Sequence, residues 1–151
     1  MQVRIRPARR GDVAALIRLF SDDALGAHAD TTDPTALPDY LAAFDWIDAS
    51  QTNAIYVAEH QGEVVGTFQT VVGRSLTGRG AAHLTVAAVQ TRTDMRGRGI
   101  GETMMRFAIE KGRTLGVHQV RLTSNLVRAD AHRFYRRLGF EQSHAGFRLV
   151  F

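Results

Sequence analysis

AAHLTVAAVQTRTDMRGRGIGETMMRFAIEKGRTLG (81–116) is the stretch that decides the fold. It begins with AAHLTVAAVQT (81–91), an apolar run typical of a strand. It ends with an apolar helical stripe that closes at Gly116 and consists of Ile100, Met104, Phe107, Ala108 and Leu115. Three glycines lie between these two parts, in RGRGIG (96–101). The stretch therefore predicts a strand, a glycine loop and a helix in that order.

The flanking sequence predicts further short elements. Upstream we expect a strand (3–8), a helix with Asp12 as N-cap (12–20), a loop (21–38), a helix (38–48), a β-hairpin (54–73) and a turn (77–80). Downstream we expect a strand (117–124), a helix (128–140) and two short strands around Ala145 and Gly146. Strand, helix and strand at 81–124 should form a right-handed parallel crossover, and the remaining strands should be antiparallel. The fold class is therefore α+β, with a mixed α/β sheet in a single domain over residues 1–151.

Composition narrows the class of protein. The chain contains no cysteine, which excludes disulfides, a thiol nucleophile and cysteine-ligated metal, and no metal site is expected. The N-terminus lacks an apolar leader and no apolar run is long enough to span a membrane, so we expect a soluble cytoplasmic protein without a membrane partner.

Charge is segregated along the chain. Residues 21–60 carry eight acidic residues and no lysine or arginine, whereas residues 61–151 carry fourteen basic and six acidic residues. The basic half suits an anionic ligand such as a nucleotide phosphate, and the acidic block suits a cationic partner. Both blocks could equally be solvated surface.

The glycine loop has two interpretations, a phosphate cradle or a plain connector. A helix N-terminus exposes free amide N–H groups and the positive end of the helix dipole, which together bind phosphate. A Walker A loop is excluded because Glu102 follows Gly101, where lysine is needed. The glycines at 97, 99 and 101 also lack the spacing of a dinucleotide-binding fingerprint.

Two motifs then point to a known family. VQTRTDMRGRGIG (89–101) resembles the acetyl-CoA-binding segment of the GNAT superfamily of N-acetyltransferases, with Arg96, Gly99 and Gly101 at the signature positions. LTSNLVRADAHRFYRRLGF (122–140) is similar to the last motif of that family. The resemblance implies a GNAT-like fold, with a central mixed and mostly antiparallel sheet of about six to seven strands flanked by about four helices.

The resemblance also implies an acyltransferase that moves acetyl from acetyl-CoA directly to a primary amine. Tyr135 matches the family tyrosine that protonates the departing thiolate, although a core aromatic is the alternative. The strand end would hold the pantetheine arm and the loop amides the pyrophosphate. The cofactor-binding residues implied are Val89, Thr91, Arg96, Gly97, Arg98, Gly99, Ile100, Gly101 and Asn125. Arg92, Arg96 and Arg98 could assist near the phosphates or be merely solvated.

The sequence departs from the family pattern at two places. Many relatives carry a glutamate as general base where Ala87 stands, so His83, His132 or a water relayed through backbone carbonyls would take its place. Arg128 stands where many relatives have an asparagine; Asn125 could take over that contact or act as a helix N-cap.

The acceptor pocket of this fold is usually formed by the first helices, which here carry the acidic block. We therefore expect a small cationic amine, such as a polyamine or an aminoglycoside-like amine, with a protein lysine or N-terminus as an alternative. Trp46 and Tyr40 could line this pocket, but core packing is the expected use of both. A non-catalytic acyl-CoA sensor is a rival interpretation, whereas a nucleic-acid binder is disfavoured by the acidic block. The apolar tail FRLVF (147–151) could form the edge of a homodimer.

Overall fold

The computed structural model describes residues 1–23 and 29–151. Its five strands form one mixed sheet in the order β1-β2-β3-β4-β5. They are β1 (Arg4–Pro7), β2 (Asn53–His60), β3 (Glu63–Arg74), β4 (Ala82–Thr91) and β5 (Gln119–Leu122). All neighbouring pairs are antiparallel except β4 and β5, which run parallel. The predicted parallel crossover at 81–124 and the α+β class are confirmed.

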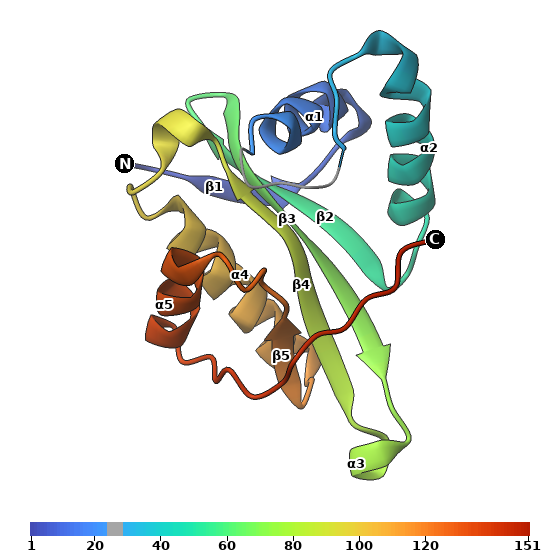
Figure 1. Cartoon of the computed structure of the whole chain (residues 1–151), viewed down its shortest axis with the longest axis vertical. Helices are drawn as coiled ribbons and strands as arrows, with labels where there is room; N and C mark the ends of the chain where they lie inside the picture. Colours follow the sequence, from blue (N-terminus) through green and yellow to red (C-terminus); the bar gives the residue numbers. More distant parts are fainter. Residues whose placement is uncertain (24–28) are drawn as a thin grey trace.

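Helices cover both faces of the sheet (Figure 1). Helices α1 (Val13–Ser21) and α2 (Leu37–Asp48) lie on one face, and α4 (Ile100–Leu115) and α5 (Ala129–Arg137) lie on the other. The fifth, α3 (Thr77–Gly80), is a single turn with left-handed residues inside it, at the predicted turn between β3 and β4. Three short 3-10 turns complete the described elements: η1 (Arg10–Asp12), η2 (Pro34–Ala36) and η3 (Thr93–Met95).

Side chains along each strand alternate between the two faces of the sheet, so the core consists of two clusters. Tyr56 of β2 packs with β3, β4 and α4, whereas the next residue, Val57, packs with α1 and α2. The larger cluster joins Phe68 and Leu84 to the apolar stripe of α4, where Met104 is fully buried. Successive side chains of a strand point to opposite faces, so both helical layers are fixed by the same strands. Leu115 is half exposed, so the buried stripe of α4 does not reach the end of the helix, whereas Met105, which was not in the predicted stripe, is fully buried.

Two sequence predictions about apolar residues are wrong. The side chain of Trp46 is 70% exposed on α2, so it does not pack in the core. The two strands expected around Ala145 and Gly146 are absent, because residues 140–151 form no ladder with any described strand. The sheet therefore has five strands in the described part of the chain, fewer than the six to seven expected.

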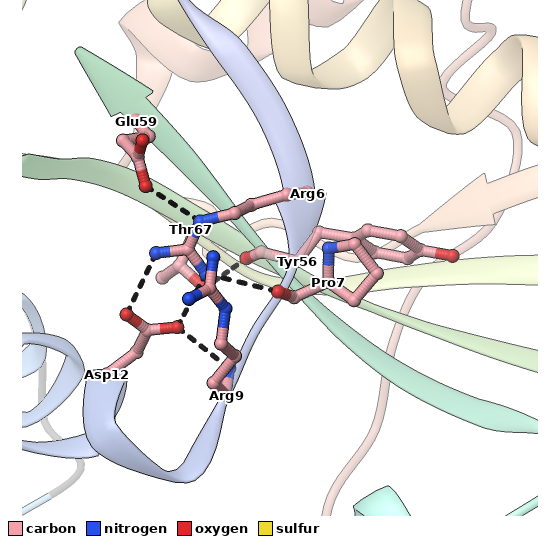
Figure 2. A network of polar contacts seen from close by, with 7 residues as sticks. All are labelled: Arg6, Pro7, Arg9, Asp12, Tyr56, Glu59 and Thr67. Atoms are coloured by element: carbon pink, nitrogen blue, oxygen red, sulfur yellow. Dashed lines mark hydrogen bonds and ion pairs between the residues drawn. The ribbon is translucent and has the colours of Figure 1, made fainter. Parts of the chain in front are cut away.

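A nearly buried arginine ties the first strand to the first helix (Figure 2). The Arg6 guanidinium donates to both carboxylate oxygens of Asp12, at 2.8 and 3.0 Å, and to Glu59 at 2.7 Å. Asp12 also accepts from the Arg9 amide at 2.7 Å. Asp12 does precede α1 as predicted, but its carboxylate turns back to Arg6 and Arg9 and leaves the helix amides uncapped. These contacts, Arg6 first, hold the pKa of Asp12 below its usual range.

None of the described helices is both long enough and apolar enough to cross a membrane.

We predict that Asp12→Ala lowers the free energy of unfolding by about 2–3 kcal/mol, because Arg6 loses two charged hydrogen bonds in a nearly buried position. The lowered pKa of Asp12 means that its contribution is complete above the ordinary aspartate pKa and is lost as the pH falls through the lowered value. The difference between wild type and variant should therefore shrink below about pH 4. Urea unfolding at several pH values measures it.

Asp45→Ala is the matched control. Asp45 pairs with Arg10 at 3.1 Å, but both side chains are more than half exposed. Its loss should cost at most about 1 kcal/mol. Equal effects of the two substitutions would contradict a special role for the Arg6 contacts.

Candidate functional site

The two parallel strands of the sheet stay together over only part of their length. β5 pairs with β4 through His83 to Val86, and no described strand continues this pairing along residues 87–91. On the other side, β3 follows β4 to the pair between Gly66 and Thr91. One side of the β4 backbone is therefore left open over residues 87–91, which we call the β4–β5 opening. Unpaired strand backbone of this kind can hydrogen-bond an extended ligand.

A bulge in β4 shapes this opening. The register with β3 shifts between Thr67 and Gln69, which pair with Gln90 and Ala87. Ala88 between them adopts a φ of 52°, in the left-handed region. Although β4 lies inside the sheet, Ala87 and Ala88 are exposed. Two small side chains, Ala87 and Ala88, therefore line the opening at the point where β5 departs from β4.

The glycine loop follows directly from the opening. Gly97 and Gly99 have φ values of 75° and 82°, which glycine adopts without strain, and a Cβ at either position would meet no protein atom within 4 Å. Gly99 is the N-cap of α4, and no side chain caps the helix amides. A free helix N-terminus beside open space is suited to an anion such as a pyrophosphate. The residues present therefore fit the pantetheine and phosphate groups of a coenzyme A thioester.

The predicted cofactor-binding residues differ in how deeply their side chains are buried. Val89 and Thr91 are half buried in the opening, while Arg96 and Arg98 are exposed on the loop. Arg96 Nε donates to the Thr91 carbonyl oxygen at 3.4 Å. Ile100 buries its side chain in the core, so it offers only its backbone to a ligand.

The start of α4 meets α5 at this place. A Cβ at Gly101 would lie 3.5 Å from Phe134 Cζ and 4.0 Å from Thr91 Oγ1, so the strand end, the loop and α5 converge. The next residue along α5, Tyr135, packs on the same core cluster as Val89. Its ring lies 5.2 Å from that of Phe134, and its hydroxyl has no hydrogen-bond partner among the described residues. Burial raises the pKa of Tyr135, and the positive charge of Arg128 opposes that rise. The phenol therefore stays protonated at neutral pH.

Arg128 connects the basic second half of the chain to the acidic block. Its guanidinium donates to Asp23 Oδ2 at 2.7 Å, which links the start of α5 to the second residue after the end of α1. Gln90 Nε2 donates to the Leu19 carbonyl oxygen at 3.3 Å and ties β4 to the same end of α1. The acidic block thus begins at the rim of the opening. Sequence reasoning missed the contact with Asp23, since its partners are 105 residues apart.

Other predicted residues have local roles. Asn125 is exposed and its Oδ1 accepts from the Val127 amide at 3.1 Å, so it forms a turn before α5 and is not the N-cap, which is Arg128. Arg92 pairs with Asp94 and Glu63 at 2.6 and 3.1 Å, so two carboxylates hold its guanidinium.

The two histidines considered as general bases differ in position. His83 pairs with Gly73, four residues before the opening begins at Ala87, which is about 13 Å along an extended strand. His132 lies on α5, and its Nε2 is 2.9 Å from the Asn125 carbonyl oxygen. His83 therefore lies outside the opening, in the stretch of β4 that β5 covers.

Comparison with known proteins decides the family. The profile of the acetyltransferase (GNAT) family matches residues 13–140. The chain belongs to this family. It is accordingly an acyltransferase of the N-acetyltransferase type, and the fold and acetyl-CoA as co-substrate are those of the GNAT family.

Similar proteins include two curated enzymes and one solved structure. The L-methionine sulfoximine/L-methionine sulfone acetyltransferase of Pseudomonas paraeruginosa is 31% identical over 95% of this chain and 83% of its own length. The aminoalkylphosphonate N-acetyltransferase of Salmonella typhimurium is 45% identical, but the match spans only 35% of this chain and 34% of that enzyme. A crystal structure described as a transcriptional regulator from Bacillus halodurans is 35% identical and superposes with a TM-score of 0.95 over 99% of this chain and 100% of its own.

Proposed function

We propose that this GNAT enzyme transfers acetyl from acetyl-CoA to the primary amine of a small acceptor at the β4–β5 opening. The observation that carries the proposal is the convergence of three features: unpaired β4 backbone over residues 87–91, an uncapped α4 N-terminus and the aromatic pair at Phe134 and Tyr135. The open backbone would bind the pantetheine arm as an added strand, and the amides at Gly97 to Gly101 would bind the pyrophosphate.

The proposed chemistry is direct transfer. The amine nitrogen attacks the thioester carbonyl carbon, the C–S bond breaks, and Tyr135 gives its proton to the departing thiolate. Backbone amides in the opening would stabilise the oxyanion that forms on the carbonyl. Position 87 carries an alanine and no carboxylate. We therefore propose that a water molecule beside the exposed Ala87 and Ala88 accepts the proton of the attacking amine.

For the acceptor, we propose a small zwitterionic amine. Both curated relatives described above are named for compact amines that carry an oxygen-rich group, a phosphonate in one and a sulfone or sulfoximine in the other. Charges of both signs lie at the rim, where Arg128 pairs with Asp23. An acceptor with both an oxyanion and an ammonium would replace both halves of this ion pair at once, so neither charge would be left unbalanced.

A cationic acceptor is the second candidate. A hollow of about 340 Å³ between the loop before η2 and α2 is lined by Asp30, Asp39 and Tyr40 among others. Much of the acidic block has internal partners, however, because Asp45 pairs with Arg10 and Asp30 accepts from the Tyr40 hydroxyl at 2.6 Å. Because these carboxylates already have partners in the protein, fewer of them can bind the amino groups of a polyamine.

An acceptor panel separates these candidates. We expect the highest kcat/KM for amino acids or aminoalkyl compounds with an oxyanion, measured as thiol release, to which a chain without cysteine adds no background. Polyamines or aminoglycosides as best substrates would favour the cationic alternative. Acetyl-CoA binding without turnover on any amine, peptides included, would contradict the enzyme and favour a sensor.

Gly99→Ala should weaken acetyl-CoA binding roughly tenfold or more, since the new methyl group would occupy space that a pyrophosphate needs. Gly80→Ala is the matched control: its φ is 77°, and a Cβ there also meets nothing within 4 Å, but it lies on the β3–β4 turn. Both variants carry the same backbone strain. Calorimetric titration with acetyl-CoA compares them, and equal affinities would remove the pyrophosphate from this loop.

Tyr135→Phe should lower kcat by roughly 10- to 1,000-fold with little change in acetyl-CoA affinity, because the variant keeps the ring and loses the proton donor. The raised pKa predicts that wild-type kcat falls only as the pH passes above the ordinary tyrosine value of about 10. Tyr56→Phe, which removes a hydroxyl from a ring stacked on Phe68 in the core, should leave kcat unchanged. Wild-type kcat in Tyr135→Phe would reduce Tyr135 to a packing residue.

A further inference from the structure

Arg128 keeps most of its hydrogen-bonding capacity unused at the candidate site. Its side chain is only 28% exposed, and one guanidinium nitrogen, Nη2, donates to Asp23. Neither Nε nor Nη1 of Arg128 has a hydrogen-bond partner among the described residues. A guanidinium carries five N–H donors, and a charge that is partly removed from water interacts strongly with an anion placed next to it. The unused edge of Arg128 is therefore able to serve a ligand group.

Arg128 and Tyr135 lie on the same side of α5. Arg128 is the N-cap of this helix, and Tyr135 follows seven residues later, which is nearly two full turns. Helical side chains lean toward the N-terminus of their helix, so the Tyr135 ring leans toward Arg128. The two groups are close enough for the charge of Arg128 to act on the Tyr135 hydroxyl, where it opposes the effect of burial on the pKa. A fixed positive charge therefore lies near the proposed proton donor.

The contact with Asp23 places this charge at the β4–β5 opening. Helices α1 and α5 lie on opposite faces of the sheet (Figure 1), yet the ion pair joins the start of α5 to the chain just after α1. The end of α1 borders the opening, because Gln90 of β4 donates to the Leu19 carbonyl oxygen. The ion pair therefore connects the two helical layers beside the open backbone of residues 87–91. The thioester of a pantetheine arm bound along this backbone would lie next to Arg128.

The leaving group of the proposed reaction needs a positive charge at this place. A free thiol has a pKa of about 8.5 and a free tyrosine one of about 10, so proton transfer from a phenol to a thiolate is uphill. Burial raises the pKa of Tyr135 and makes it a still weaker acid. Negative charge passes first to sulfur and then, as the proton moves, to the phenol oxygen. A cation near both atoms stabilises this charge on either of them.

We propose that Arg128 stabilises the coenzyme A thiolate as it departs, and then the Tyr135 phenolate that remains when the thiol has been protonated. The electron pair of the C–S bond stays on sulfur, the proton moves from the phenol to sulfur, and the phenolate regains a proton from water. Asp23 is a positioning residue that holds the guanidinium by Nη2. Arg128 can act in this way whether Asp23 or an acceptor oxyanion holds Nη2. The inference rests on the proposed function, because it needs the thioester in the opening.

The thiol of bound coenzyme A reports directly on this role. The chain has no cysteine, so the ultraviolet absorbance of the thiolate, titrated against pH with desulfo-coenzyme A as the blank, follows that one thiol. Arg128→Asn should raise the pKa of the bound thiol by about 1 or more, because a neighbouring opposite charge favours the thiolate. Asparagine is a good N-cap, so α5 should keep its start. Arg133→Asn is the matched control: it removes an exposed arginine of the same helix, which pairs with Asp130, and should leave the thiol pKa unchanged.

Kinetics and a second variant complete the test. Arg128→Asn should lower kcat about tenfold or more, and Arg128→Lys, which keeps the charge, should recover part of the loss. The double variant Arg128→Asn with Asp23→Asn removes both charges of the pair and keeps the comparison available if the single variant unfolds. An equal thiol pKa in wild type and both asparagine variants, or a loss confined to the KM of the acceptor, would overturn the proposal and leave the cofactor site standing. No binding of coenzyme A to the wild type would contradict the proposed function as well.

Discussion

The limited pairing between β4 and β5 is the constraint on which the candidate site depends. The two strands are parallel neighbours from His83 to Val86, and no described strand pairs beyond this with that side of β4. On the other side, β3 pairs with β4 up to its last residue, Thr91, on both sides of the bulge at Ala88, so the sheet holds the open stretch in place. The strand then turns through η3 into the glycine loop, which sets the first turn of α4 beside the open backbone.

Packing keeps this arrangement open. Ile100 and Met104 anchor α4 in the core next to its N-terminus, so the uncapped helix end cannot move away from the strand. On the other face, Gln90 fixes β4 to α1, and Arg6 fixes the beginning of α1 to the sheet. Rigid elements hold functional groups more accurately than loops do. The protein atoms that we propose bind the cofactor are mostly backbone atoms, and buried side chains fix their positions.

The sequence predicts the parts of this structure that depend on local pattern. The strand, glycine loop and helix of 81–116 carry strong periodicity and a glycine at each helix boundary, and all three are found within a residue or two of their expected ends. Features that depend on distant partners were not predictable. The pairing of Arg128 with Asp23 and the divergence of β4 from β5 arise from the tertiary fold, and no local pattern encodes them.

The tail shows the same limit in a different form. FRLVF has the alternation of a strand, but a strand exists only when it has a partner, and the described single chain provides none. Trp46 likewise falls on a helix whose buried side is carried by Phe44, which leaves the larger ring in solvent. In both cases residue type was a weaker guide than the position of the neighbouring elements.

The most direct test of the β4–β5 opening is amide hydrogen exchange of the wild-type protein with and without acetyl-CoA. Bound ligand should slow exchange in two segments, residues 87–91 of β4 and residues 97–102 at the loop and the start of α4, because their free amides would gain acceptors. Saturating acetyl-CoA that leaves both segments unchanged, or protects only the hollow near Tyr40, would contradict the account.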